Sequence, residues 1–358
     1  MRCTRAGQEF CAGTVAGQAC AAAATCIADG NGHCTIPAEF VSIADWAFDG
    51  LESLTSVTIH SGVTSMGVFA FRGTRLTSVV LPDNLAEVSE GAFSEVTTLS
   101  SVTFGSGITT IGPDAFMSTG LTSLVLPDSI AELGNKAFFN CLELTSLTFG
   151  TGIDTIPEMC FSGTQTSSHT GLAITIPGTV TDIGRWAFQN SGAASVTIEE
   201  GVDSIHRQAF DNMDNLVEIV IPGSVQEIGS WAFQNCDLLS DVTIQHGVEA
   251  IQQGAFRNTV LTGLQSLPES ITTVHADSFD SWVSLCGGAS SLGLDACPCW
   301  TPCSSSCETA THRVQFTNAT SCQAAVDCTT GDDDCGRFCA GTVAGQACAA
   351  AATCIADG

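Results

Sequence analysis

The chain contains very little positive charge. Lys136 is its only lysine, and ten basic residues stand against 37 acidic ones in 358 residues, which gives a net charge of −27. Nucleic acids and anionic membrane surfaces are themselves negative, and such a chain is repelled by both. We therefore expect neither a nucleic-acid partner nor binding to anionic membranes.

Long apolar runs are also missing. No stretch of about 20 apolar residues is present, so we expect no membrane insertion, and the first residues lack the apolar core of a signal peptide. The 19 cysteines, however, form no Cys-x-x-Cys pairs and indicate disulfides, hence an oxidising compartment. We expect an extracellular or cell-surface protein, and the missing signal peptide suggests that the start of the gene product is absent from this sequence.

Familiar catalytic motifs are absent as well. The chain has no Gly-x-Ser-x-Gly elbow, P-loop, dinucleotide fingerprint or His-Glu-x-x-His. Four of its seven histidines, His60, His206, His246 and His275, fall in different repeats and are expected at the surface. The adjacent Glu199 and Glu200 would face opposite ways on a strand. We predict that the protein is not an enzyme and needs no cofactor or metal.

What the chain does have is a repeat. A phenylalanine follows a small residue at intervals of 22 or 23 residues, with a single interval of 27. A fixed period of this length is typical of a solenoid, in which each repeat stacks on the previous one. The eleven anchors are Phe48, Phe71, Phe93, Phe116, Phe138, Phe161, Phe188, Phe210, Phe233, Phe256 and Phe279.

Each repeat contains a segment with the alternation of a strand. In "LTSVTI", Val57 and Ile59 are expected to point inward and Ser56 and Thr58 outward. In four repeats the strand ends at a proline, which cannot donate to a ladder: Pro82, Pro127, Pro177 and Pro222. Ile130, Leu133 and Phe138 are inward candidates in the segment that follows one of these strands.

A turn is expected two residues after most anchors, because glycine and asparagine tolerate left-handed backbone. Eight repeats have one of them there: Gly50, Gly73, Asn140, Gly163, Asn190, Asn212, Asn235 and Asn258. The interval of 27 is explained by an insertion, Ser162–Gly171, which we interpret as a surface loop. One extra residue in Leu261–Ser270 predicts a bulge in the last coil.

Repeats such as "LTSLVLPDSIAELGNKAFFNC" closely resemble the BspA-like class of leucine-rich repeats, whose pattern is L-x-x-[VIL]-x-[IL]-P-x-[SG]-V-x-x-I-x-x-x-A-F-x-x-C. The resemblance covers about residues 34–282, although tyrosine, common in such repeats, is absent. It implies a leucine-rich-repeat solenoid of the α/β-type repeat class, dominated by β-structure, with about eleven coils and a parallel strand ladder. It also implies a secreted or surface protein that binds other proteins, often as an adhesin.

Three domains are predicted: a cysteine-rich module (1–33), the solenoid (34–284) and a second cysteine-rich module (285–358). The segment Phe10–Gly30 recurs letter for letter at Phe338–Gly358. We interpret this as a cassette of module, repeat array and module, whose ending looks truncated. The modules would cap the apolar ends of the solenoid, since disulfides can stabilise a unit without its own core.

The cysteines fall into two groups. Cys141, Cys160 and Cys236 lie inside repeats and are expected to be buried and reduced. The other sixteen are disulfide candidates of unknown pairing: Cys3, Cys11, Cys20, Cys26, Cys34, Cys286, Cys297, Cys299, Cys303, Cys307, Cys322, Cys328, Cys335, Cys339, Cys348 and Cys354.

Two motifs in the flanks have alternative interpretations as metal sites. "CPCWTPCSSSC", with His33 and His312 in the flanks, could suggest zinc, but its spacing lacks two separated Cys pairs, so we favour disulfides. "GDDDC" lacks the alternate ligand spacing of a calcium loop and is interpreted as a solvated acidic turn. Asn318 lies in a glycosylation sequon.

The outward strand positions would line one long face, rich in serine and threonine, which also simply suit strands. An acidic end could meet a basic partner. The candidate ligand-face residues are Thr58, Thr103, Thr148, Thr175, Thr197, Glu199, Glu218, Asp241, Thr243 and Gln245. We expect this face to bind another protein, either a basic one or a host or matrix surface component. The alternatives are a structural spacer of a matrix or cell wall, and binding of ice or carbohydrate by the Ser/Thr ladder.

Overall fold

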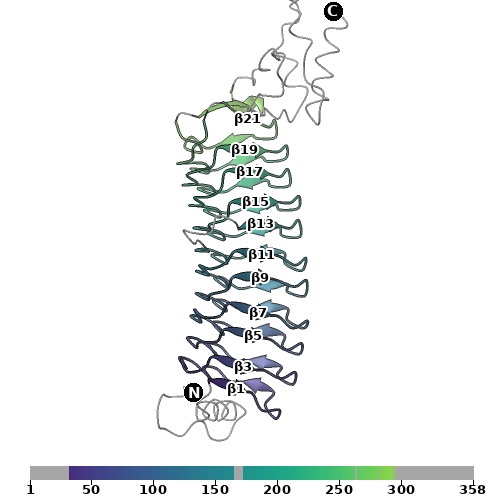
Figure 1. The fold of residues 1–358 in the computed structure, drawn as a ribbon. Helices are drawn as coiled ribbons and strands as arrows, with labels where there is room; N and C mark the ends of the chain where they lie inside the picture. The colour runs from purple at the N-terminus through teal and green to yellow at the C-terminus, as the bar shows by residue number, and fades with distance from the viewer. Residues whose placement is uncertain (1–31, 165–171, 263, 282, 293, 295–358) are drawn as a thin grey trace, which may run out of the picture.

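The computed structural model describes residues 32–164, 172–262, 264–281, 283–292 and 294. These residues form one column of stacked coils (Figure 1). Every strand pair is parallel, and the only helix in the described part is a short 3-10 turn, Ser290–Leu292. The predicted β-dominated solenoid is confirmed.

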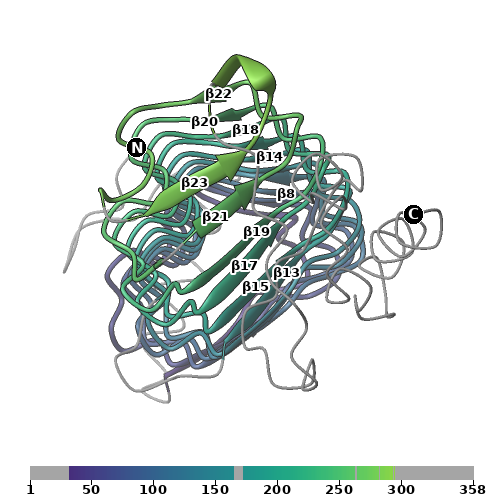
Figure 2. The same cartoon turned by 90° about the horizontal axis from the view of Figure 1, so that it is seen from above.

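The first strand ladder is the one that the sequence predicts. Its members follow one another from coil to coil, and in Figure 2, which looks down the column, they lie along one side. They are β1 (His33–Thr35), β3 (Ser56–Thr58), β5 (Ser78–Val80), β7 (Ser101–Thr103), β9 (Ser123–Val125), β11 (Ser146–Thr148), β13 (Ala173–Ile176), β15 (Ser195–Ile198), β17 (Glu218–Ile221), β19 (Asp241–Ile244), β21 (Leu264–Leu267) and β23 (Ser284–Gly287).

A second ladder of two-residue strands runs along another side of the column, and sequence reasoning missed it. Strands this short contain too few residues to show a period. They are β2 (Ser42–Ile43), β4 (Ser65–Met66), β6 (Glu87–Val88), β8 (Thr110–Ile111), β10 (Glu132–Leu133), β12 (Thr155–Ile156), β14 (Asp182–Ile183), β16 (Ser204–Ile205), β18 (Glu227–Ile228), β20 (Ala250–Ile251) and β22 (Thr273–Val274).

Coils of the first ladder associate in pairs. Its strands form two-stranded sheets, β1–β3, β5–β7, β9–β11, β13–β15, β17–β19 and β21–β23. In every pair, proline closely follows the first strand: Pro37, Pro82, Pro127, Pro177, Pro222 and Pro268. Leu81 donates its N–H to Thr103 in the following coil (2.9 Å). At the next position of the strand, an N–H would point toward the preceding coil. Proline stands at that position and has no N–H to donate, so no hydrogen bond forms to the preceding coil there.

Glycine lets the two coils of a pair approach closely. A Cβ added at Gly105 would overlap the carbonyl group of Pro82, and one at Gly150 would overlap that of Pro127. Only a residue without a side chain allows this contact between backbones. Proline follows the first strand of every pair, and glycine makes this contact in the pairs β5–β7 and β9–β11, so the sequence contained a signal for a unit of two coils.

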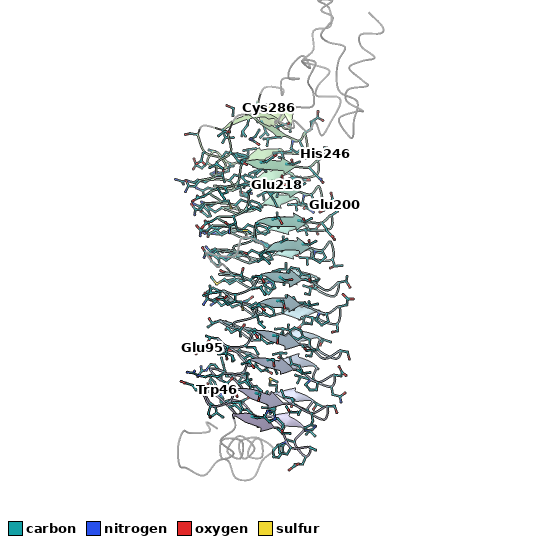
Figure 3. All side chains as sticks on the ribbon, in the orientation of Figure 1. Trp46, Glu95, Glu200, Glu218, His246 and Cys286 are labelled. Carbon is teal, nitrogen blue, oxygen red and sulfur yellow. The ribbon has the colours of Figure 1, made fainter. Side chains whose placement is uncertain are left out.

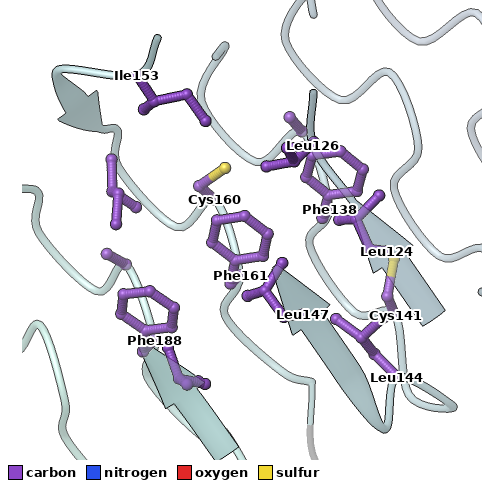
Figure 4. Close-up of a cluster of buried hydrophobic side chains, with 14 of the residues drawn as sticks. Leu124, Leu126, Phe138, Cys141, Leu144, Leu147, Ile153, Cys160, Phe161 and Phe188 are labelled. Carbon is purple, nitrogen blue, oxygen red and sulfur yellow. The ribbon is translucent and has the colours of Figure 1, made fainter. Parts of the chain in front are cut away.

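The core is a continuous stack of the anchor phenylalanines. From Phe48 to Phe279, neighbouring ring centroids lie 4.8–5.5 Å apart with interplanar angles of 0–17°. The first ten rings are buried and Phe279 partly so. Figure 4 shows Phe138, Phe161 and Phe188 among leucines and two cysteines. The stack continues across the insertion, so the extra residues do not interrupt the core.

The eight predicted turn residues all have left-handed backbone. Glu95 and Ser118 adopt it as well, at the same place in their repeats (φ 62° and 56°). A second left-handed row was missed, two residues before the anchor, where φ is 54–64° in Trp46, Phe69, Gly91, Asp114, Lys136, Met159, Trp186, Gln208, Trp231 and Gly254. Most of these residue types do not favour that conformation.

Hydrogen bonds between coils explain why the second row tolerates it. The N–H of each anchor from Phe48 to Phe256 donates to the residue that precedes the next anchor, as between Phe138 and Cys160 (2.9 Å). Residues in the left-handed row also donate to the next coil, for example Lys136 to Glu158 (3.0 Å). The stacking of coils thus overrides local preference.

Several detailed expectations need adjustment. Leu133 is only partly buried, although Ile130 and Phe138 are fully so. The proposed domain boundaries at 33/34 and 284/285 fall inside β1 and β23, and the division into three domains stays a prediction. β21 pairs with β23 as the strands of the earlier pairs do, so the bulge predicted in the last coil stays a prediction.

One histidine was wrongly expected at the surface. His60 is half-buried, its Nδ1 accepts the Gly62 N–H (3.0 Å), and its Nε2 lies 3.0 Å from the carbonyl oxygens of Pro37 and Phe40. The ring therefore carries its proton on Nε2 and joins two coils. The other three, His206, His246 and His275, are exposed as expected.

Candidate protein-binding face

The strand face comprises the outward side chains of the first ladder. Thr58, Thr103, Thr148, Thr175 and Thr197 are exposed on it, whereas Thr243 is half-buried. The register places equivalent residues directly side by side, as with Thr175 and Thr197. The structure thus brings the threonines predicted from the sequence into one row.

Valine and threonine alternate along much of this row. Threonine occupies the second coil of each of the first five pairs, and valine occupies the first coil of three. Val80, Val125 and Val220 are 64%, 63% and 47% exposed. Because valine and threonine have the same branched shape, the row is even in height but alternates between apolar and hydroxyl-bearing side chains.

Beyond the first pair of coils, the threonine hydroxyls in this row are free to bind a ligand; in that first pair, Thr58 Oγ1 lies 3.5 Å from His33 Nε2. At the entry to the strands, Thr55, Ser100 and Thr145 donate their hydroxyls to carbonyl oxygens of the preceding coil (3.0 Å each). By contrast, the hydroxyls of Thr103 and Thr148 make no hydrogen bond within the described residues, and the same is true of the row members Thr175 and Thr197. Their hydrogen-bonding capacity is directed at solvent.

The predicted acidic end separates into two kinds of residue. Glu218 and Asp241 lie in register on β17 and β19, are exposed, and have no ion-pair or hydrogen-bond partner among the described residues. Glu199 instead accepts the Gly178 N–H (3.1 Å) and Gln245 accepts the Gly223 N–H (3.3 Å). The latter two hold turns together and are less available to a partner.

Glu200 and other carboxylates at the same turns also bind backbone amides. Glu200 accepts the N–H groups of Gly223 and Ser224 (3.2 and 3.1 Å). Hydrogen bonds from the backbone and side chain of Ser106 lower the pKa of the Asp83 carboxyl. Figure 3 shows Glu200 and His246 at the turns, beside the face on which Glu218 lies. These carboxylates therefore stabilise the edge of the face.

Positive charge is absent from the strand face in the described ranges. The six described cations all lie in the segments that connect a second-ladder strand to the next first-ladder strand. They are Arg72, Arg75, Lys136, Arg185, Arg207 and Arg257.

Three of these arginines already have structural partners. Arg75 pairs with Glu52 (3.1 Å). Arg72 forms a bidentate pair with Asp49 (2.8 and 3.1 Å) over the stacked rings of Trp46 and Phe69. Arg207 lies over the ring of Trp231, 4.3 Å from its centroid. In Figure 3, Trp46 lies at the edge opposite the one that carries Glu200 and His246.

The repeat cysteines belong to the core. Cys141, Cys160 and Cys236 are buried, free thiols, as predicted. Burial raises the pKa of the Cys141 thiol to about 11 and that of Cys236 to about 12, and it raises the pKa of Cys160 further. All three are protonated at neutral pH and therefore unreactive.

Two disulfide candidates lie among the described residues. Cys34 and Cys286 are buried and disulfide-bonded. The other fourteen candidates, the sequon at Asn318 and the duplicated segment lie outside the described residues, so these expectations remain predictions.

Neither a metal site nor a membrane-spanning helix is found in the described part of the chain. No group of three or more His, Cys, Asp or Glu side chains there could hold a metal ion. No helix in the same residues is both long and apolar enough to cross a membrane.

The repeats match the family model described as "BspA type Leucine rich repeat region", in six copies over residues 31–142, 109–172 and 172–286. The match spans most of the chain, which therefore belongs to the BspA-type leucine-rich repeat family. Members of this family are typically non-enzymatic, and membership suggests a role in protein binding or recognition. No curated protein matches the chain.

Several solved bacterial structures are similar to this chain at low identity. A leucine-rich cell surface protein from Faecalibacterium prausnitzii is 21% identical over 73% of this chain and 80% of its own, with a TM-score of 0.40. The pneumococcal vaccine antigen PcpA is 19% identical over 66% and 72%, with a TM-score of 0.43. A leucine-rich repeat protein from Eubacterium ventriosum is 21% identical over 73% and 80%, with a TM-score of 0.42.

Proposed function

We propose that this protein is a non-enzymatic recognition protein of the cell surface or extracellular space, and that it binds another protein through its strand face. The observation that carries the proposal is the row of unsatisfied threonine hydroxyls and exposed valines along the first ladder. A regular, rigid surface of this kind offers contact area at little entropic cost, because its backbone is already ordered by the coils on either side.

The character of the face limits its partners. It has no lysine or arginine among the described residues, and it bears carboxylates at its C-terminal end. A partner with a basic surface, such as a host or matrix protein, would be attracted to it. The family relationship supports protein binding in general, and the location outside the cell is inferred from the cysteines.

The proposal is tested with substitutions on the two ladders. Thr103→Arg together with Thr148→Arg places two bulky cations on the strand face, and Ser65→Arg together with Thr155→Arg places them on exposed positions of the second ladder. Both double variants change the net charge equally. Wild type and variants would be screened by biolayer interferometry against a panel of purified secreted and matrix proteins.

We expect the strand-face variant to lose at least tenfold in affinity for any panel member that wild type binds, because the new side chains hold the partner away from the face. The second-ladder variant should bind within about twofold of wild type. A partner that tolerates the strand-face variant but is lost by the second-ladder variant would refute the proposal.

A further inference from the structure

The strand face changes character in the coils of β17 and β19. Glu218 and Asp241 replace the serines that occupy the equivalent position in most earlier coils. Exposed apolar side chains accompany them: Val217 (48%), Val220 (47%), Leu238 (51%) and Val260 (45%). Solvent-exposed apolar residues gathered beside charges are typical of protein-binding surfaces, whereas single ones are common anywhere.

Backbone contacts place these residues in adjoining coils. Glu218 and Asp241 are direct partners in the register of β17 and β19. Just upstream, the Val217 carbonyl accepts a backbone hydrogen bond from the coil of β19 (2.9 Å). One coil further on, Val260 donates its N–H to the carbonyl of Leu239, the residue that follows Leu238 (3.2 Å). The apolar and acidic side chains therefore lie on three successive coils.

The two carboxylates have no counter-charge. Neither has an ion-pair partner within the described ranges, and the six described cations lie off the strand face. Two like charges in register repel one another. A cation from a partner would relieve that repulsion, while the neighbouring apolar side chains would be buried by the same contact.

We propose that these six residues, Val217, Glu218, Val220, Leu238, Asp241 and Val260, form an acidic–apolar patch that binds an extended segment of another protein. The segment presents a basic and an apolar side chain on one face, two residues apart. Its spacing matches Glu218 and Val220, which are two residues apart on β17 and both exposed. The inference rests on the proposed function and specifies where, and with what chemistry, the strand face binds.

The test uses the full chain and a synthetic peptide repeating Lys-Ser-Val-Ser, which places lysine and valine on one face when extended. Repeats of Glu-Ser-Val-Ser and Lys-Ser-Ser-Ser serve as control peptides. Binding would be measured by fluorescence anisotropy at low and at high salt. The protein variants are Glu218→Lys with Asp241→Lys, and, as a matched control, Glu227→Lys with Glu249→Lys.

The control variant reverses two exposed carboxylates of the same two coils on the side of the second ladder, so its net charge equals that of the patch variant. We expect wild type and control to bind the Lys-Ser-Val-Ser peptide equally, and the patch variant to bind at least tenfold more weakly. High salt should weaken wild-type binding, because exposed charges are screened. Replacing Val220 by serine should weaken it several-fold while its salt dependence remains.

Three outcomes would overturn the inference. The first is that wild type does not bind the Lys-Ser-Val-Ser peptide. The second is that it binds a control peptide, with glutamate in place of lysine or serine in place of valine, equally well. The third is that the control variant loses as much affinity as the patch variant, which would reflect net charge alone. The proposed function is judged separately. If a panel protein loses affinity for the Thr103→Arg, Thr148→Arg variant but not for the patch variant, the strand face binds protein and the patch assignment fails.

Discussion

Replacing Phe138 by alanine is expected to lower the free energy of unfolding by about 3–5 kcal/mol, the range observed for removing a buried aromatic ring. Phe138 is fully buried and stacks between Phe116 and Phe161, at 5.4 and 5.3 Å. Its loss leaves a cavity in the middle of the column, where hydrogen-bonded coils on both sides limit collapse. Guanidinium unfolding followed by tryptophan fluorescence measures the change.

The adjacent Phe139 provides a matched control. Its ring is only partly buried and lies outside the stack of anchors. Phe139→Ala should therefore cost about 1–2 kcal/mol, the value of the lost apolar burial without a cavity. If Phe138→Ala destabilises the protein no more than Phe139→Ala, the anchor stack is not the principal core of the solenoid.

Replacing Gly201 by alanine is the second change with a large expected effect, a loss of about 3 kcal/mol. Gly201 has φ of 120°, a region that residues with a Cβ avoid, and an added Cβ would overlap the Gly178 carbonyl oxygen in the other coil of its pair. The two coils would have to separate to make room. The same unfolding assay measures the loss.

A variant at Gly50 separates the effect of close approach between coils from the effect of left-handed backbone. It also has positive φ, 66°, but an added Cβ would meet no atom within 4 Å. Gly50→Ala should cost only about 1–2 kcal/mol, from the left-handed backbone alone. Equal losses in the two variants would contradict the view that glycine is needed where paired coils touch.

The sequence predicted those parts of the fold that are decided locally. The anchors and the turn residues were found because phenylalanine recurs at one period and because glycine and asparagine tolerate left-handed backbone. The left-handed row that includes Trp46, Lys136 and Met159 was missed because hydrogen bonds between coils impose it on residues without that preference. The pairing of coils was missed, although the proline after the first strand of every pair indicates it.

The candidate site was predicted in outline only. The alternation of side chains along a strand predicted that the threonines point outward. They form one row because each coil repeats the same register. It could not separate Glu218 and Asp241 from Glu199, because that difference depends on which turn amide lies within reach of a carboxylate. The exposed Val217 and Leu238 were also missed, since only the structure shows that their coils leave them uncovered.

Hydroxyl-radical footprinting of the protein in complex with a panel partner tests the central claim most directly. Val80 and Val125 on the strand face are 64% and 63% exposed, and Val41, beside the second ladder, is 52% exposed, so all three should be labelled in the free protein. The account predicts that the partner protects Val80, Val125 or Val220 and leaves Val41 labelled. Protection of Val41 with full labelling of the strand-face valines would contradict it.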